Sequence, residues 1–235
     1  MSATLLSASQ GKLLDSPYTA KDTSNFIFLT QTIMVLGSIA SAYFEAGQPA
    51  VYWLTVPSYF LYLGYAWFKG NRLLMRLMLF GTIAGLLELW ADNYSVSTIG
   101  ALVYPDGPLI WSSPLYMPMS WAIALTQLGY MSVLIVRKWG SMVAILLMAV
   151  SGALYIPLYE QLAKQAGWWF YHNCSMLLNA PYYIILCEGL IAASLPILVI
   201  KFVTPKPGVG KAVAFGILEG IWIGLSAVIA YTLLP

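Results

Sequence analysis

Long apolar runs recur along the whole chain and constrain its fold more than any other feature. A helix needs about 20 predominantly apolar residues to cross a bilayer, and runs of that length are too long for the roughly 10-residue strands of a membrane barrel. No alternating pattern persists, so the sequence predicts helices. Seven spans are expected, at residues 25–45, 49–68, 72–91, 114–136, 140–159, 181–201 and 212–233. The predicted fold is therefore all-α, a polytopic bundle of seven transmembrane helices in a multi-pass integral membrane protein.

Composition and domain organisation agree with this class. Of the 235 residues, 60% are hydrophobic and 9% are charged. A polar N-terminal segment, residues 1–24, precedes a single transmembrane domain, residues 25–235, with two long loops at 92–113 and 160–180. The N-terminal segment has no apolar core followed by a cleavage site, so we expect no signal peptide and insertion directed by the first span.

The basic residues predict an orientation. Only Lys164 falls on one side of the expected membrane, and ten fall on the other: Lys12, Lys21, Lys69, Arg72, Arg76, Arg137, Lys138, Lys201, Lys206 and Lys211. Because Lys and Arg are in excess on cytoplasmic loops, we expect a cytoplasmic N-terminus and a C-terminus outside. Both long loops then lie on the outer face. The basic residues cluster at helix ends rather than on a face or tail, so no nucleic-acid partner is expected.

Acidic residues at membrane depth are the candidate catalytic residues, because each costs on the order of 2.5 to 3.5 kcal/mol to insert. They are Glu88, Asp92, Glu188 and Glu219. Gly81, Gly85, Glu88 and Asp92 follow one another at spacings of four, three and four and therefore share one helix face, which should look inward. Two carboxyl groups so close do not both stay ionised, so one retains a proton that it can donate. The alternative for Asp92 is a residue at the outer interface that ends the helix.

The other acids divide by position. Glu188 lies about two turns from the outer end of its span and can share the outer half of the bundle with Glu88. Glu219 stands beside a face of small residues, Gly216, Gly220 and Gly224, which are most simply packing residues; a hydrogen bond to a neighbouring helix is the alternative to catalysis for Glu219. Glu45 and Glu160 are expected to be solvated helix ends.

Aromatic side chains are the candidate substrate-binding residues, because their rings stabilise a nearby cation by about 0.5 to 2 kcal/mol. They are Trp111, Tyr116, Trp121, Tyr183 and Trp222. In the first long loop, Tyr104–Pro108 is expected to form a turn, and the loop a small hairpin lid. In the second, residues 168–172 favour an interfacial aromatic belt; the alternative is that both loops roof a cavity.

Several classes of protein are excluded by missing residues. The single histidine, His172, lies in a loop and cannot supply paired haem or di-iron ligands, and Cys174 and Cys187 form neither a zinc motif nor a disulfide framework. The last span has no interior lysine for retinal, and no phosphate-binding glycine loop is present. We therefore expect no metal site and no cofactor.

The chain resembles the compact integral-membrane terpene cyclases of meroterpenoid pathways in its size, its helix count and the order of Glu88, Tyr94 and Val103-Tyr104-Pro105. It is also similar to membrane carotenoid hydratases and cyclases, in which an intramembrane Glu precedes a Tyr- and Pro-rich outer loop. These resemblances imply that a buried acid protonates an isoprenoid double bond or epoxide without a metal, and that the cation is then quenched.

Together these features predict a membrane-embedded enzyme acting on an isoprenoid or similarly apolar lipid. Glu88 is the expected proton donor, Asp92 tunes it, and Glu188 accepts a proton or positions the substrate. The expected partners are the bilayer and this apolar small molecule. The alternative is a proton-coupled transporter or a lipid-binding protein that uses the same acids. An odd number of spans and the lack of a visible inverted repeat argue mildly against the commonest transporter plan.

Overall fold

A computed structural model describes residues 20–105, 107–201 and 208–235. Most of the predicted N-terminal segment lies outside these residues, as do Lys12, Asp106 and Lys206. The described part of the chain contains seven long α-helices: α2 (Ala20–Tyr43), α3 (Gly47–Phe68), α4 (Arg72–Asn93), α5 (Met117–Trp139), α6 (Ser141–Gln165), α7 (Tyr182–Leu198) and α8 (Val209–Leu233). The prediction of an all-α fold is confirmed.

Six of these helices are long and apolar enough to cross a membrane. The protein is a multi-pass integral membrane protein. Helix α3 lies outside the set of six, although it has 22 residues. Its polar side chains and tyrosines lower its mean hydropathy. Helix α3 is therefore long enough for a membrane span but less apolar than the other six helices.

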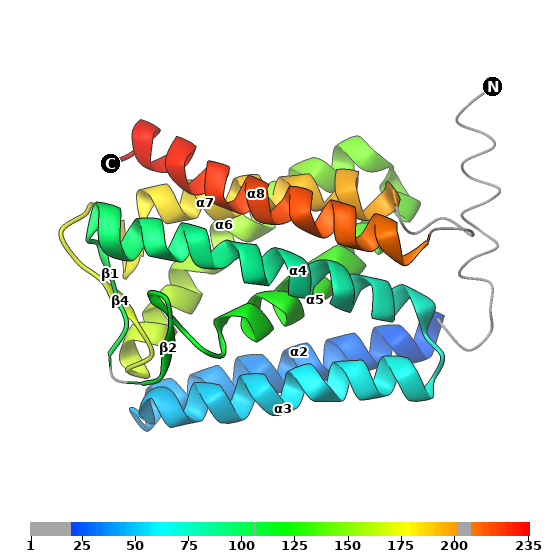
Figure 1. Cartoon of the computed structure of the whole chain (residues 1–235), viewed down its shortest axis with the longest axis horizontal. Helices are drawn as coiled ribbons and strands as arrows, with labels where there is room; N and C mark the ends of the chain where they lie inside the picture. The colour runs from blue at the N-terminus through cyan, green and yellow to red at the C-terminus, as the bar shows by residue number, and fades with distance from the viewer. Residues whose placement is uncertain (1–19, 106, 202–207) are drawn as a thin grey trace.

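The helices lie side by side along the long axis of the molecule (Figure 1), with α4 packed along both α5 and α8, and α7 packed along both α6 and α8. Glycines allow the close approach of α4 to α5. A Cβ added at Gly81 would lie 2.6 Å from the Ala122 carbonyl oxygen, and one at Gly85 would lie 2.5 Å from that of Pro118. The predicted glycine face of α8 likewise packs on α4, so α4 is held between two helices.

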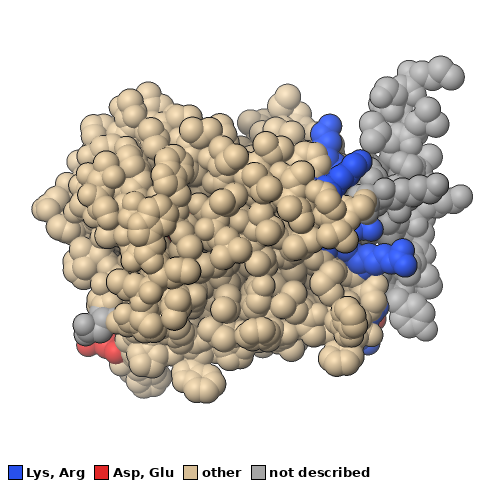
Figure 2. Space-filling view, in the orientation of Figure 1, with Lys and Arg blue, Asp and Glu red and all other residues tan. Residues whose placement is uncertain are grey.

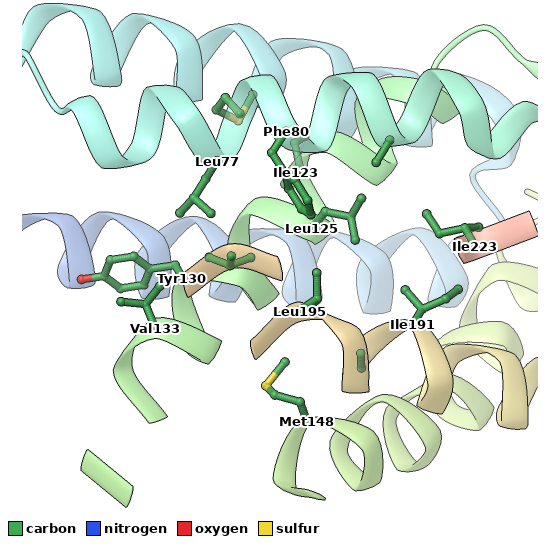
Figure 3. Close-up of a cluster of buried hydrophobic side chains, with 14 of the residues drawn as sticks. Leu77, Phe80, Ile123, Leu125, Tyr130, Val133, Met148, Ile191, Leu195 and Ile223 are labelled. Carbon is green, nitrogen blue, oxygen red and sulfur yellow. The ribbon is translucent and has the colours of Figure 1, made fainter. Parts of the chain in front are cut away.

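A cluster of buried apolar side chains fills the space between the helices (Figure 3). Leu77 and Phe80 come from α4, Ile123 from α5, Leu195 from α7 and Ile223 from α8, and all are at most 2% exposed. Between membrane helices such contacts act through van der Waals packing rather than through the hydrophobic effect, because the surrounding lipid is equally apolar.

Short strands organise the two long loops. β1 (Leu102–Val103) of the first loop pairs antiparallel with β4 (Phe170–Tyr171) of the second. β2 (Leu109–Ile110) pairs with β3 (Ser113–Pro114), and β5 (Met176–Leu177) pairs with β6 (Ala180–Pro181). The first loop therefore contains the predicted hairpin, but its turn falls at Trp111 and Ser112 rather than at Tyr104–Pro108, because the backbone just before Tyr104 pairs with the other loop.

Several helix ends differ from the predicted boundaries: α2 begins at Ala20 rather than at residue 25, and two ends continue into the predicted loops. Helix α4 runs to Asn93 and continues into a π-helical segment, η1 (Tyr94–Ile99), so residues 92–99 are helical rather than part of a loop. Gly100 ends this segment with a φ of 70°, a left-handed conformation that favours glycine. Helix α6 extends to Gln165, so residues 160–165 are also helical. Hydropathy alone ends a span at its first polar residues, whereas backbone hydrogen bonding continues through them.

The charged side chains mark the two ends of the bundle. Among the described residues, every Lys and Arg except Lys164 lies where α2, α4 and α8 begin or where α3, α5 and α7 end, and these positions meet at one end (Figures 1 and 2). We name this the basic end. The opposite end carries residues 94–116 and 166–181, and we name it the loop end.

Candidate functional site

The last turns of α4 place two carboxyl groups together at the loop end. Glu88 and Asp92 are 2% and 8% exposed, and their carboxyl groups are in hydrogen-bonding contact with each other. The Tyr104 hydroxyl donates a hydrogen bond of 2.6 Å to Oδ2 of Asp92. The indole of Trp121 lies beside Glu88. The shared inward face is confirmed, and the alternative of Asp92 as a residue at the outer interface is wrong, because the first loop covers it.

Glu188 belongs to the same group of acids. It lies in α7, is half-buried, and is close enough to Glu88 and Glu160 to interact electrostatically with both. The depth that the sequence gives for Glu188 therefore agrees with its place near Glu88. A cavity shared by these acids stays a prediction.

Glu160 is a fourth member that the sequence analysis missed. It is 5% exposed, its Oε2 accepts a hydrogen bond of 2.5 Å from Trp169 Nε1, and it interacts electrostatically with Asp92 and Glu188. The expected solvated helix end is wrong here, because α6 continues past it and the second loop folds back over it. The signal for this burial is the Trp168-Trp169 pair, which follows Glu160 by eight and nine residues and offers an indole N–H donor. Glu45, by contrast, is exposed as predicted.

Tyrosines of both loops surround these four acids, which we name the acid cluster (Glu88, Asp92, Glu160 and Glu188). Burial and the neighbouring Asp92 raise the pKa of Tyr104 well above its usual value, and burial and Glu160 do the same to the pKa of Tyr171. Both hydroxyls therefore stay protonated, and that of Tyr104 is the donor to Asp92. Among the described residues, no three His, Cys, Asp or Glu side chains are arranged to hold a metal ion, so the four carboxyl groups are spread out rather than gathered around one point.

The structure separates the five predicted substrate-binding aromatics. Trp121 is half-buried beside Glu88, and the buried Tyr116 and Tyr183 interact electrostatically with Asp92 and Glu160, respectively. Trp111 is 63% exposed at the hairpin turn. Trp222 donates a hydrogen bond of 3.1 Å to the Leu190 carbonyl oxygen, between α7 and α8. Three of the five therefore adjoin the acid cluster.

The second loop does not form the interfacial belt that its aromatics favour. Trp168 and Trp169 are buried, and both rings contact Tyr159 of α6. Helix α3 is attached to this loop, because Gln48 Nε2 donates a hydrogen bond to the Trp168 carbonyl oxygen. Together with the β1–β4 pairing, these contacts join both loops into one cover over the loop end.

Glu219 lies apart from the acid cluster. It is fully buried between α8 and α7, where the Ser194 hydroxyl lies 2.7 Å and 3.0 Å from its two carboxylate oxygens. None of the interactions described for the acid cluster includes Glu219. For Glu219 the sequence left two alternatives, catalysis or a hydrogen bond to a neighbouring helix, and the structure contains the hydrogen bond.

An open pocket of about 400 Å³ lies next to the acid cluster on the loop side. Its walls include Val96, Tyr104, Leu109, Trp111, Ser112 and His172. Tyr104 is thus a wall of the pocket and also the hydrogen-bond donor to Asp92. Both cysteines, Cys174 and Cys187, are free thiols as predicted.

Comparison with protein families places the chain in one of them. The model of the DUF6989 family, described as a domain of unknown function, matches residues 89–234. The match spans more than half of the chain, so the protein belongs to this family. Comparisons with curated proteins and with solved structures gave no match.

Proposed function

We propose that the protein is a membrane-embedded enzyme that protonates an isoprenoid or similarly apolar lipid and guides the resulting carbocation to its product. The observation that carries this proposal is the buried contact between Glu88 and Asp92, with Asp92 also bonded to Tyr104. Buried acids in a membrane helix are expensive, and a pair of them inside a covered bundle end is typical of proton transfer.

The hydrogen bonds indicate which carboxyl group holds the proton. Contact between two carboxyl groups is favourable when one of them donates a proton to the other. Asp92 already accepts the Tyr104 hydroxyl, which favours its charged form, so the proton belongs on Glu88. Oε2 of Glu88 is buried and has no hydrogen-bond partner within the described residues. At rest this proton lies in the contact with Asp92, and a half-turn of the Glu88 carboxyl group about its Cγ–Cδ bond brings the protonated oxygen to the unpartnered side, where it can protonate a substrate.

The chemistry follows from these positions. Glu88 transfers its proton to a carbon–carbon double bond or an epoxide oxygen, and the substrate becomes a carbocation while Glu88 becomes a carboxylate. The Asp92 carboxylate and the Trp121 ring stabilise the positive charge. Glu188 then removes a proton from a neighbouring carbon, which forms a new double bond, and the return of a proton from Glu188 to Glu88, directly or through solvent, restores the starting state. The resemblance to terpene cyclases and carotenoid hydratases supports the same sequence of steps.

The orientation belongs to the same proposal. We propose that α3 also crosses the membrane, with the N-terminus inside and the C-terminus outside. Helices α2 and α3 are joined by a short turn, and the basic residues after α3 lie at the same end as the start of α2. In a variant without Cys174 and Cys187, single cysteines at Ser9 and at Pro235 should be labelled from opposite sides of intact membranes. Labelling of both from one side contradicts this topology.

Two measurements test the function. Mass spectrometry of the purified protein should identify a copurified apolar molecule of isoprenoid type. Incubation of the protein and the extracted lipids in D₂O should then give a product that carries deuterium on carbon if Glu88 protonates a double bond, or an isomer of the substrate that has lost its epoxide if Glu88 protonates an epoxide oxygen. Proton-driven transport of a polar solute with neither product supports the transporter alternative and contradicts the enzyme.

A further inference from the structure

The pocket at the loop end has a distinctive chemistry. Its walls are mostly apolar, and four of the lining side chains carry polar atoms: Tyr104, Trp111, Ser112 and His172. The Tyr104 and Ser112 hydroxyls already donate to Asp92 and Asn93, so toward a ligand they can only accept a hydrogen bond. Among the described residues that line it, none is Lys, Arg, Asp or Glu. A pocket without a charged side chain offers a charged head group no ion pair to offset its partial loss of water, so it favours an uncharged group. Hydroxyls and an imidazole suit a ligand hydroxyl or carbonyl.

The hairpin that contributes to this pocket exposes apolar side chains. Leu109 and Trp111 of the β2–β3 hairpin line the pocket, and both are exposed, as is their neighbour Ile110. The β5–β6 hairpin, which does not line the pocket, also exposes Leu177 and Leu178. Trp111 and Leu178 each occupy a turn at positive φ, 59° and 58°, where glycine or asparagine would be less strained. Apolar residues held at such positions favour a role for their side chains in the membrane interface, where Trp is enriched.

Tyr104 joins the pocket to the acid cluster. Its backbone follows β1, which the pairing with β4 holds in place, and its hydroxyl donates to Asp92. Val96 of the pocket follows Glu88 by eight residues along α4 and η1, which corresponds to about 12 Å at 1.5 Å per residue. The pocket and Glu88 are therefore separated by about this distance along the helix.

We propose that this pocket binds the uncharged, hydrogen-bonding end of an amphipathic lipid that arrives from the bilayer. The identity of this lipid as the substrate rests on the proposed function. The apolar chain of that lipid extends from the pocket past Tyr104 toward Glu88. The protonated double bond or epoxide then lies about 12 Å from the polar end. The pocket thus selects lipids by the charge of their head group and by the distance from the head group to the reactive bond.

Photolabelling of the protein in lipid vesicles tests the pocket without requiring turnover. The probe is a long-chain alcohol with a photoreactive diazirine beside its hydroxyl end, and the carboxylic acid and the amine of the same chain are the matched charged probes. The alcohol should label peptides that contain Val96, Trp111 or His172, and the charged probes should label them less. Labelling spread evenly over lipid-facing helices, or equal labelling by the charged probes, overturns the proposal.

Variants locate the site. Val96→Phe should fill the pocket and abolish labelling by the alcohol. Leu109→Trp, at an exposed position on the pocket wall, should reduce the labelling and serves as the test if Val96→Phe does not fold. Leu177→Phe, at a comparably exposed position on the other hairpin, should leave labelling unchanged. The alcohol should still label the Glu88→Gln protein. Full turnover in Glu88→Gln contradicts the proposed function alone. If neither Val96→Phe nor Leu109→Trp changes the labelling, the pocket proposal alone is contradicted.

Discussion

Two buried carboxyl environments in this protein differ in how fully their oxygens are engaged. Glu219 is fully buried, and both its oxygens lie within hydrogen-bonding distance of one hydroxyl, that of Ser194. Glu88 is just as buried, but its neighbour is another acid and its Oε2 has no partner within the described residues. The first arrangement ties two helices together. The second leaves an acidic oxygen available, so depth in the membrane does not by itself distinguish a structural acid from a reactive one.

The largest expected difference between the two environments is in turnover. Glu88→Gln keeps the shape of the side chain but cannot deliver a proton, so turnover should fall by about 10² to 10⁴-fold, the usual contribution of general acid catalysis. The measurement is product formation in vesicles. Glu219→Gln is the matched control and should retain activity. The reverse pattern would move the chemistry to α8.

Helix packing beside the acid cluster should respond next most strongly. Gly85→Ala places a Cβ 2.5 Å from the Pro118 carbonyl oxygen, so α4 must move away from α5, and overpacking of this kind costs roughly 1 to 3 kcal/mol. Gly189→Ala, beside Glu188, meets nothing closer than 3.4 Å and should change stability little. Thermal unfolding in detergent compares the two. Equal unfolding midpoints would mean that α4 and α5 are less tightly packed than the structure shows.

Removal of the partner of Glu219 should have an effect no larger than this, and only on stability. Ser194→Ala leaves a buried carboxyl group without its donor, which costs about 1 to 3 kcal/mol. The double variant Ser194→Ala with Glu219→Met should recover much of the lost stability, because no buried polar group is then left without a partner. Unfolding midpoints and turnover are measured in parallel. A loss of turnover in a stable Ser194→Ala protein would contradict the structural role of Glu219.

Tyr104→Phe should have the smallest effect of the four. It removes a hydrogen bond to Asp92 but leaves both carboxyl groups in place, so a loss of about tenfold in turnover is expected, the equivalent of one hydrogen bond of about 1.4 kcal/mol. Tyr171→Phe is the control in the paired strand, because its hydroxyl has no described bond to Asp92. If both variants lose the same activity, the effect comes from the loops rather than from the bond to Asp92.

The pattern of residues along the chain was sufficient for much of the fold and part of the site. Apolar length predicted the helices, because each must satisfy its own backbone hydrogen bonds within lipid. The spacing of Gly81, Gly85, Glu88 and Asp92 predicted one inward face, because helical period alone decides which side chains point together. The sequence also predicted a hairpin in the first loop, but it placed the turn at Tyr104–Pro108, whereas the turn lies at Trp111 and Ser112.

Contacts between distant segments decided the rest. Glu160 is a helix-end residue by local pattern, and only the return of Trp169 over α6 buries it and adds it to the acid cluster. The pairing of β1 with β4 joins loops about 70 residues apart, and no local signal specifies such a partner. Glu88 and Glu219 both stand among mostly apolar residues along the chain. The sequence by itself determined that both acids are buried in membrane helices. The tertiary structure decided that Ser194 engages Glu219, and that Asp92, Trp121 and Glu188 surround Glu88. Most of these partners come from neighbouring helices, and no single segment encodes how the helices pack.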